Sequence, residues 1–105
     1  MSFTGKEDHS ISIADAAELT RNYRESSESG AIIAEFFGRE ALERILAQEG
    51  CVGIRCYYGQ KEDGKPALVL VGADANEEDL LDGSEIAQAG DPCPPNCASA
   101  NPLNS

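Results

Sequence analysis

The sequence lacks a long hydrophobic run, which argues against a membrane-spanning helix. No apolar stretch approaches the roughly 18 to 20 residues needed to cross a bilayer. Residues 1–10 are polar where a signal peptide would have an apolar core. We therefore expect a cytoplasmic protein with no membrane partner. Its 105 residues suffice for one modest core and are too few for two.

Basic residues are also scarce. Eight Lys and Arg face 19 Asp and Glu, which gives a net charge of −11. Such a field repels phosphate backbones, so nucleic acid is excluded as an expected partner. Lys65 is the last basic residue, and seven acidic residues follow it. They are Asp74, Glu77, Glu78, Asp79, Asp82, Glu85 and Asp91.

Histidine occurs once, as His9 in the polar N-terminal segment, without a recognisable partner for a catalytic triad. Carboxylates are so numerous that none stands out as an acid–base pair. The glycines are scattered and form no phosphate-binding loop. The sequence therefore indicates no catalytic residue and no cofactor, and it favours a role other than catalysis.

Two helices are predicted. Ser12 followed by Asp15 resembles a capping box, and apolar residues recur at helical spacing up to Tyr23, which predicts a helix over 13–26. A second apolar stripe predicts a helix over 39–48, with Gly50 as its stop. Between them, residues 31–37 are short, β-branched and aromatic. They fit a strand or the front of a helix, and we assign a strand.

Two further strands, 51–58 and 67–71, flank a turn-rich loop and predict an antiparallel hairpin. Alternation places one set of side chains under the helices, namely Val52, Ile54, Cys56 and Tyr58. The second strand is apolar on both faces, as expected of a central strand.

The expected fold is therefore α+β, in the order α-β-α-β-β, with two helices on one face of a small antiparallel sheet. The expected division is a polar N-terminal tail over 1–10, the domain over 11–81, and an acidic, then proline- and cysteine-containing extended tail over 82–105. Because so small a sheet invites completion by a second copy, we also expect a homodimer.

Arg55 and Tyr57 fall on the predicted outer face of the sheet. An aromatic residue beside an arginine is typical of protein contact sites, and the same pair also suits the cap of a half-exposed sheet. Both interpretations stay open.

Four cysteines occur, and without a secretory signal the simplest expectation is four reduced thiols. Cys51 and Cys56 lie at odd separation on one strand, so they make a poor chelating pair and are expected to be buried. Cys93 and Cys97 flank Pro94-Pro95-Asn96, where a turn from Pro94 to Cys97 would bring the thiols together. That pair is a candidate disulfide, redox pair or metal site, or an inert part of the tail.

The acidic stretch partly matches a calcium-loop pattern, with candidate ligands at Asp74, Asn76, Glu78, Asp82 and Glu85. The sixth position is Asp79, where the sharp turn needs glycine. A solvated acidic loop with a helical turn near residues 77–81 explains the stretch better.

The sequence resembles a group of small, uncharacterised bacterial proteins of the Bacteroidetes type. The segments that carry this resemblance are Cys56 to Gly59, Leu70 to Asp74, and Cys93 to Cys97 with the ending Pro102-Leu103-Asn104. The resemblance implies a bacterial cytosolic protein and no particular chemistry.

The leading functional hypothesis is a non-enzymatic protein-interaction or regulatory module, whose proline-bearing tail suits binding in extended form. The alternative is a thiol redox or metal-binding protein that uses Cys93 and Cys97.

Overall fold

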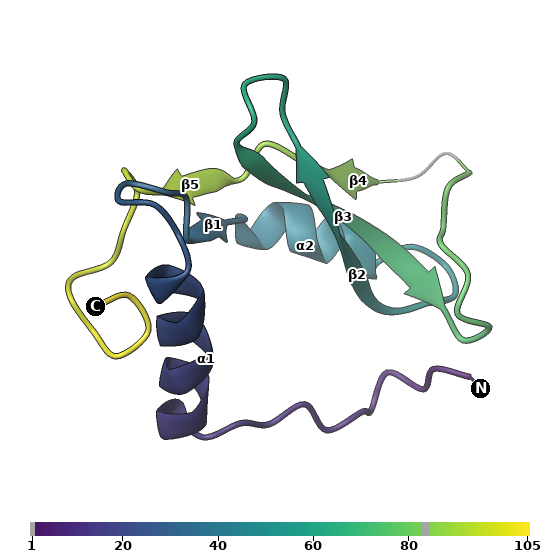
Figure 1. The fold of residues 1–105 in the computed structure, drawn as a ribbon. Helices are drawn as coiled ribbons and strands as arrows, with labels where there is room; N and C mark the ends of the chain where they lie inside the picture. Colours follow the sequence, from purple (N-terminus) through teal and green to yellow (C-terminus); the bar gives the residue numbers. More distant parts are fainter. Residues whose placement is uncertain (1, 83–84) are drawn as a thin grey trace. The chain divides into compact units, whose positions relative to one another are not determined.

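The computed structural model describes residues 2–82 and 85–105, and it is an α+β fold with two helices and two antiparallel sheets (Figure 1). The chain forms two compact units. The first comprises Met1–Asp8 and Phe37–Gly90, and the second comprises His9–Phe36 and Asp91–Ser105. The sequence-based boundaries at residues 11 and 81 separate a domain from its tails, and they stay a prediction.

The first unit is built on the expected hairpin. Strand β2 (Cys51–Gln60) pairs antiparallel with β3 (Pro66–Asp74), from Gly53 opposite Ala73 to Gln60 opposite Pro66. A register shift between Cys51 and Gly53 gives β2 a bulge at its start. Beyond Asp74 the chain turns back, and β4 (Ile86–Ala87) pairs with the other side of β3. The sheet order β2-β3-β4 confirms β3 as the central strand.

Helix α2 (Arg39–Leu46) packs on β2 and β3, and it ends two residues before the predicted limit. Its Ile45 is only 1% exposed, and Leu70, Val71 and Ala73 of β3 are also buried. Gly50, with φ of 80°, has the left-handed backbone that glycine tolerates best, and it leads the chain from the helix into β2. These residues form the core of the first unit.

The second unit contains α1 (Ile13–Glu25), whose Ser12 side chain accepts a hydrogen bond from the amide of Asp15, as the capping pattern predicts. The expected strand over 31–37 is the shorter β1 (Ala34–Phe36). It pairs antiparallel with β5 (Asp91–Cys93), with Ala34 opposite Cys93.

The expectation of a single sheet is therefore wrong, because β1 pairs with a strand from the C-terminal segment rather than with the hairpin. The segment expected as an extended tail contributes β4 and β5. Pro92 lies within β5, and proline is tolerated there because a two-stranded ribbon consists only of edge strands. Neither β1 nor β5 has a hydrophobic pattern strong enough to predict which strand it pairs with.

The buried side chain of Ile45 gives a test of this packing. We expect Ile45→Ala to lower the free energy of unfolding of the first unit by about 2 to 5 kcal/mol, because it removes buried methyl groups and leaves a cavity. Leu46→Ala is the matched control, since Leu46 is 49% exposed, and we expect it to cost less than about 1 kcal/mol. Urea unfolding measures both. Equal losses in the two variants would contradict the assignment of Ile45 to the core.

Candidate functional site

Strand β2 forms one edge of the three-stranded sheet, and no strand among the described residues pairs with its outer side. It is ten residues long. Natural proteins usually protect such an edge with lysine, proline, a bulge or a short strand. After its initial bulge, β2 has none of these, and Arg55 is its one charged residue. Gly5 lies against the carbonyl of Val52 at the start of the strand. From Ile54 to Gln60 the edge is open to a partner strand.

The hydrogen bonds at both ends of the hairpin show which residues of β2 face outward. At the loop, the amide of Lys61 donates to the carbonyl of Lys65. At the other end, Gly72 and Asp74 bond to the returning segment, so Ala73 between them faces β2. Backbone groups alternate along a strand, and both ends give the same result. The outward N–H and C=O groups are those of Ile54, Cys56, Tyr58 and Gln60.

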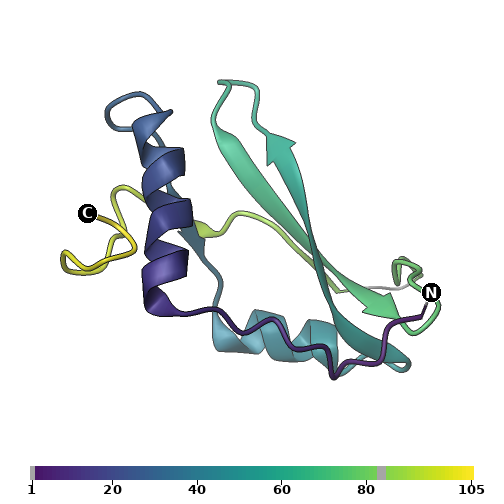
Figure 2. The same ribbon diagram turned by 60° about the horizontal axis from the view of Figure 1, so that its bottom comes forward.

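The side chains at the loop end of β2 are exposed. Tyr58 is 95% exposed, Tyr57 is 48% exposed, and Cys56 is an exposed free thiol. The expectation that Cys56 and Tyr58 lie under a helix is thus wrong. The reason is length: α2 has eight residues and spans about 12 Å, whereas the ten residues of β2 span about 33 Å. Figure 2 shows the hairpin loop extending well beyond α2.

Cys51 differs from Cys56. It lies at the helix end of β2, it is half-buried, and its Sγ donates to the carbonyl of Gly53 at 3.2 Å. The expected burial therefore holds only in part, and for one of these two cysteines.

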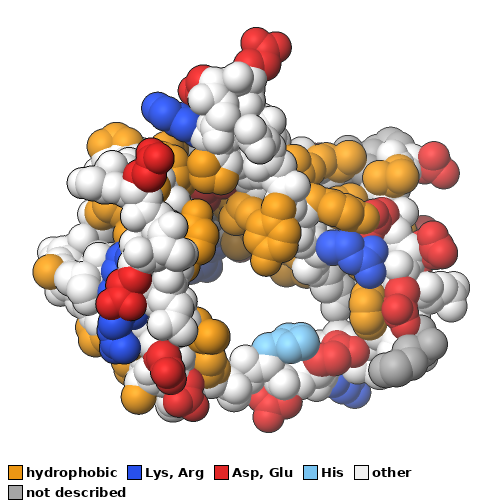
Figure 3. Space-filling view, in the orientation of Figure 1, with side chains coloured by type: hydrophobic (Ala, Val, Ile, Leu, Met, Phe, Trp, Pro, Cys, Tyr) orange, Lys and Arg blue, Asp and Glu red, His pale blue; other side chains and the backbone are white. Residues whose placement is uncertain are grey.

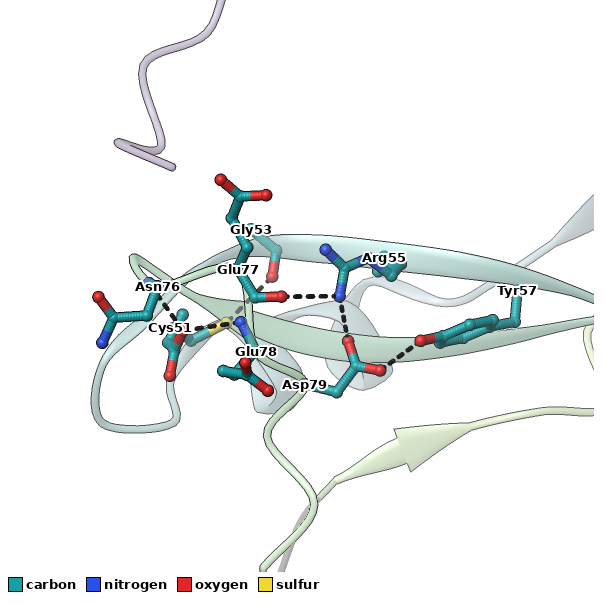
Figure 4. A network of polar contacts seen from close by, with 9 residues as sticks. Cys51, Gly53, Arg55, Tyr57, Asn76, Glu77, Glu78 and Asp79 are labelled. Atoms are coloured by element: carbon teal, nitrogen blue, oxygen red, sulfur yellow. Dashed lines mark hydrogen bonds and ion pairs between the residues drawn. The ribbon is translucent and has the colours of Figure 1, made fainter. Parts of the chain in front are cut away.

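Arg55 and Tyr57 both bind Asp79, on one face of the hairpin (Figure 4). The guanidinium Nη1 of Arg55 lies 2.5 Å from Oδ1 of Asp79, and the Tyr57 hydroxyl donates to Oδ2. The Arg55 side chain keeps 30% of its exposed area, and that of Asp79 keeps 18%. One carboxylate therefore holds both residues that the sequence singled out.

Two further contacts fix Arg55. Its Nη1 also donates to the carbonyl of Glu77 at 3.2 Å, and its guanidinium carbon lies 5.6 Å from the centre of the Phe3 ring, within the range of a cation–π interaction. The amide of Phe3 donates to the carbonyl of Ala75, which ties the N-terminal residues to the turn after β3. Arg55 is thus held against its own sheet.

Asp79, Arg55 and Tyr57, with Phe3 beside Arg55, form one cluster, the Asp79 cluster. Its contacts shift the pKa values of Asp79 and Tyr57. The hydrogen bond from Tyr57, followed by that from Arg55, lowers the pKa of Asp79 against the opposing effect of partial burial. The hydrogen bond to Asp79, helped by partial burial, raises the pKa of Tyr57. At neutral pH the carboxylate is charged and the phenol is protonated, and this is the arrangement that the contacts require.

Sequence reasoning missed Asp79 and Phe3 as members of this cluster. Asp79 reaches Arg55 because the chain reverses after β3, with a bridge between Ala73 and Asp79. The expected helical turn near residues 77–81 is wrong, since Asp79 pairs with β3 in extended form. No local signal in the sequence indicates this partner, because the contact depends on the chain reversal after β3.

Two of the calcium-loop candidates, Asp74 and Glu85, make other contacts. Oδ1 of Asp74 accepts from the amides of Asn76 and Glu78, and therefore stabilises the turn. Oε2 of Glu85 lies 3.6 Å from Nε of Arg44, which makes an ion pair. Within the part of the chain that the structure describes, no three His, Cys, Asp or Glu side chains gather closely enough to hold a metal ion. The acidic side chains visible in Figure 3 are spread over the surface.

Cys93 and Cys97 form a disulfide, with their Cα atoms 4.8 Å apart. The expectation of four reduced thiols is therefore wrong for this pair. The predicted turn brings them together but lies earlier than expected, because the amide of Asn96 donates to the carbonyl of Pro92. Cys93 is buried and Cys97 is exposed. While the bond is intact, neither sulfur is a thiolate ligand for a metal.

The C-terminal residues beyond the disulfide also fold back. Asn101 and Asn104 exchange side-chain hydrogen bonds with neighbouring backbone groups, and Arg24 of α1 donates to the carbonyl of Leu103 at 2.6 Å. These contacts lie within the second unit. They make residues 98–105 a series of turns rather than an extended peptide.

Comparison of the chain with protein-family models, with curated proteins and with solved structures finds no match. Among the described residues, no helix combines the length and the apolar composition that a membrane crossing requires.

The Asp79 cluster predicts a specific dependence of stability on pH. Because folding lowers the pKa of Asp79, its stabilisation is present above the unfolded value of about 3.9 and is lost as the pH falls through the lower folded value. Because folding raises the pKa of Tyr57, that stabilisation is present below about 10 and is lost as the pH rises through the higher folded value.

We expect the stability difference between wild type and Asp79→Asn to be constant near neutrality and to shrink at both extremes. Tyr57→Phe is the control, since it removes the alkaline loss and keeps only the part of the acid loss that Arg55 causes. Thermal unfolding from pH 2 to pH 11 measures the stability losses at acid and at alkaline pH. A difference that does not depend on pH would contradict the cluster.

The disulfide predicts a local effect of reduction. Closing a five-residue loop constrains the unfolded chain. In the chain-entropy description this raises the free energy of unfolding by about 2 kcal/mol. We expect reduction to speed amide exchange of Ile33 and Asn96, whose partners are the carbonyls of Cys93 and Pro92. Amides of β3 serve as the control and should not change. Unchanged exchange at Ile33 would show that the disulfide does not stabilise the β1–β5 pair.

Proposed function

We propose that the protein is a non-enzymatic protein-interaction module whose contact element is the outer edge of β2. The observation that carries this proposal is the combination of an open, unprotected edge with the 95% exposed Tyr58. An open strand edge offers a row of main-chain donors and acceptors to an extended partner, and neighbouring side chains supply selectivity. Tyrosine is enriched at such contacts because it buries a large area with few rotatable bonds.

The edge supports this role better than the C-terminal segment does. The sequence hypothesis had the proline-bearing tail bound in extended form, but those residues are shaped by a disulfide and by turns. The Asp79 cluster supports the edge in a second way. It neutralises Arg55 and keeps its long side chain off the strand edge. A rigid, nearly neutral strand loses little entropy on binding and has little charge to desolvate.

The remaining expectations fit this proposal. The net charge of −11 disfavours nucleic acid as the partner. We propose a protein partner in the cytoplasm of a bacterium, as the resemblance to the small bacterial group implies.

A second candidate function, thiol–disulfide exchange at Cys93 and Cys97, is favoured by the disulfide itself and by the exposure of Cys97. Disulfides in a reducing cytoplasm are usually transient and redox-responsive. In a cytoplasmic protein, this pair would therefore cycle between the disulfide and two thiols. Alkylation of thiols in intact cells, followed by mass spectrometry, distinguishes the two. Complete oxidation that survives reductive stress would assign the disulfide a structural role.

The test of the edge is Tyr58→Lys. Lysine at an edge position disfavours strand addition, and the Tyr58 side chain is 95% exposed, so we expect the fold to persist. Leu19→Lys is the matched control, because it adds the same charge at a residue of α1 that is 62% exposed. The measurement is the amount of protein that the chain captures from lysate, including further copies of itself. We expect this amount to fall at least ten-fold with Tyr58→Lys and to stay unchanged with Leu19→Lys.

Circular dichroism melting checks that both variants are folded. Equal capture by the two variants would remove β2 as the contact element.

A further inference from the structure

We propose that the partner strand is β2 of a second copy of this chain, paired antiparallel across a two-fold axis at Cys56. This inference rests on the proposed function, because it names the occupant of the same edge. It would join two three-stranded sheets into one of six strands, in the order β4-β3-β2-β2-β3-β4. Two-fold pairing of identical surfaces is the commonest route to a homodimer.

The backbone groups of the edge are complementary to themselves. The outward N–H and C=O groups lie on even-numbered residues, from Ile54 to Gln60. In an antiparallel pair, the two residues of a hydrogen-bonded pair both face the partner. Self-pairing therefore requires two even-numbered residues opposite each other. A two-fold axis at Cys56 satisfies this requirement, and so does an axis at Tyr57.

The side chains favour the axis at Cys56. With this axis Ile54 lies opposite Tyr58 of the second copy, and the same pair recurs on the other side of the axis. Arg55 then lies opposite Tyr57. With the axis at Tyr57, Ile54 would lie opposite the polar Gln60. Aromatic and β-branched pairs stabilise neighbouring strands, so the axis at Cys56 gives the better match.

Charge distinguishes a second copy from a basic partner. Arg55 is the one charged residue of β2, and Asp79 neutralises it. The two edges therefore bring little charge together, whereas the remainder of each chain is strongly acidic and repels its copy. Salt screens that repulsion, so self-association should strengthen with ionic strength. Binding of a basic partner to the acidic surface would weaken instead.

The contact is small. Burying a tyrosine covers on the order of 150 to 250 Å². Two copies of Tyr58 therefore supply only part of the roughly 1,200 Å² typical of stable interfaces. We expect a dimer with a dissociation constant in the micromolar range rather than the nanomolar range.

Cys56 makes the register measurable. Residues opposite each other in a hydrogen-bonded pair have Cα atoms about 5.5 Å apart, which is within the range that a disulfide spans. With the axis at Tyr57, the two Cys56 residues would be diagonal neighbours at about 7 to 8 Å, beyond that range. An added copper–phenanthroline oxidant takes two electrons from the two Cys56 thiols, two protons are released, and one sulfur–sulfur bond forms.

The experiment combines sedimentation equilibrium at 5 to 500 µM with this oxidation, on the full chain. We expect a concentration-dependent dimer that tightens with salt, and a covalent dimer that Cys56→Ser abolishes and Cys51→Ser does not. We expect Tyr58→Lys to raise the dissociation constant at least ten-fold, and Leu19→Lys to change it less than two-fold.

Several results would overturn the inference. A monomer at every concentration would remove the second copy as occupant, and capture of another protein that depends on Tyr58 would then leave the proposed function intact. A dimer that cross-links through Cys51, or that Tyr58→Lys does not weaken, would place the contact elsewhere. A dimer that Tyr58→Lys weakens but that does not cross-link through Cys56 would overturn the register.

Discussion

The antiparallel pairing of β2 with β3 is the constraint on which the rest of the first unit depends. It extends without a further shift from Gly53 opposite Ala73 to Gln60 opposite Pro66. A side chain moves to the opposite face of a sheet if the register slips by one residue. This register therefore places Ile54 on the α2 face and Arg55 beside Asp79. It also decides which amides of β2 point toward open solvent.

Two features set the limits of the sheet. Helix α2 covers only one end of the hairpin, because eight helical residues are much shorter than ten extended ones. The Asp79 cluster fixes the face that carries Arg55 and Tyr57, and the residues that form it come from β2, from the segment after β3 and from the N-terminus. What stays uncovered is the loop end of β2 and its outer edge from Ile54 to Gln60, since Gly5 lies against the carbonyl of Val52. The proposed interaction site is thus the part of the strand that the chain's own elements do not cover.

Local patterns in the sequence predicted the helices and the hairpin well. Ser12 and Asp15 mark the start of α1, and the turn residues around Gly64 separate two strongly β-prone runs. Long-range pairing was not predictable in this way. Ala34 pairs with Cys93, 59 positions later, and neither three-residue strand has a pattern that specifies its partner. The burial of Cys56 was predicted wrongly because alternation gives the face of a side chain and says nothing about how far a helix extends over it.

The candidate site was predictable only in part. Arg55 and Tyr57 stood out as an arginine beside an aromatic residue, but their partner Asp79 depends on a chain reversal that the acidic stretch does not announce. The spacing and the prolines of Cys93 and Cys97 indicate a pair, but they do not determine whether it is oxidised, as it is in the structure. The open edge of β2 follows from the order of the strands in the sheet. It could not be predicted from any local sequence pattern.

The central claim, that β2 has an open outer edge, is tested most directly by amide hydrogen exchange of the dilute chain at single-residue resolution. Amides that face β3, at Gly53, Arg55, Tyr57 and Gly59, should be protected. Those of Ile54, Cys56, Tyr58 and Gln60 should exchange much faster, which gives an alternating pattern along the strand. Uniform protection of both sets at low concentration would contradict the account, because it would mean that another part of the same chain covers the edge.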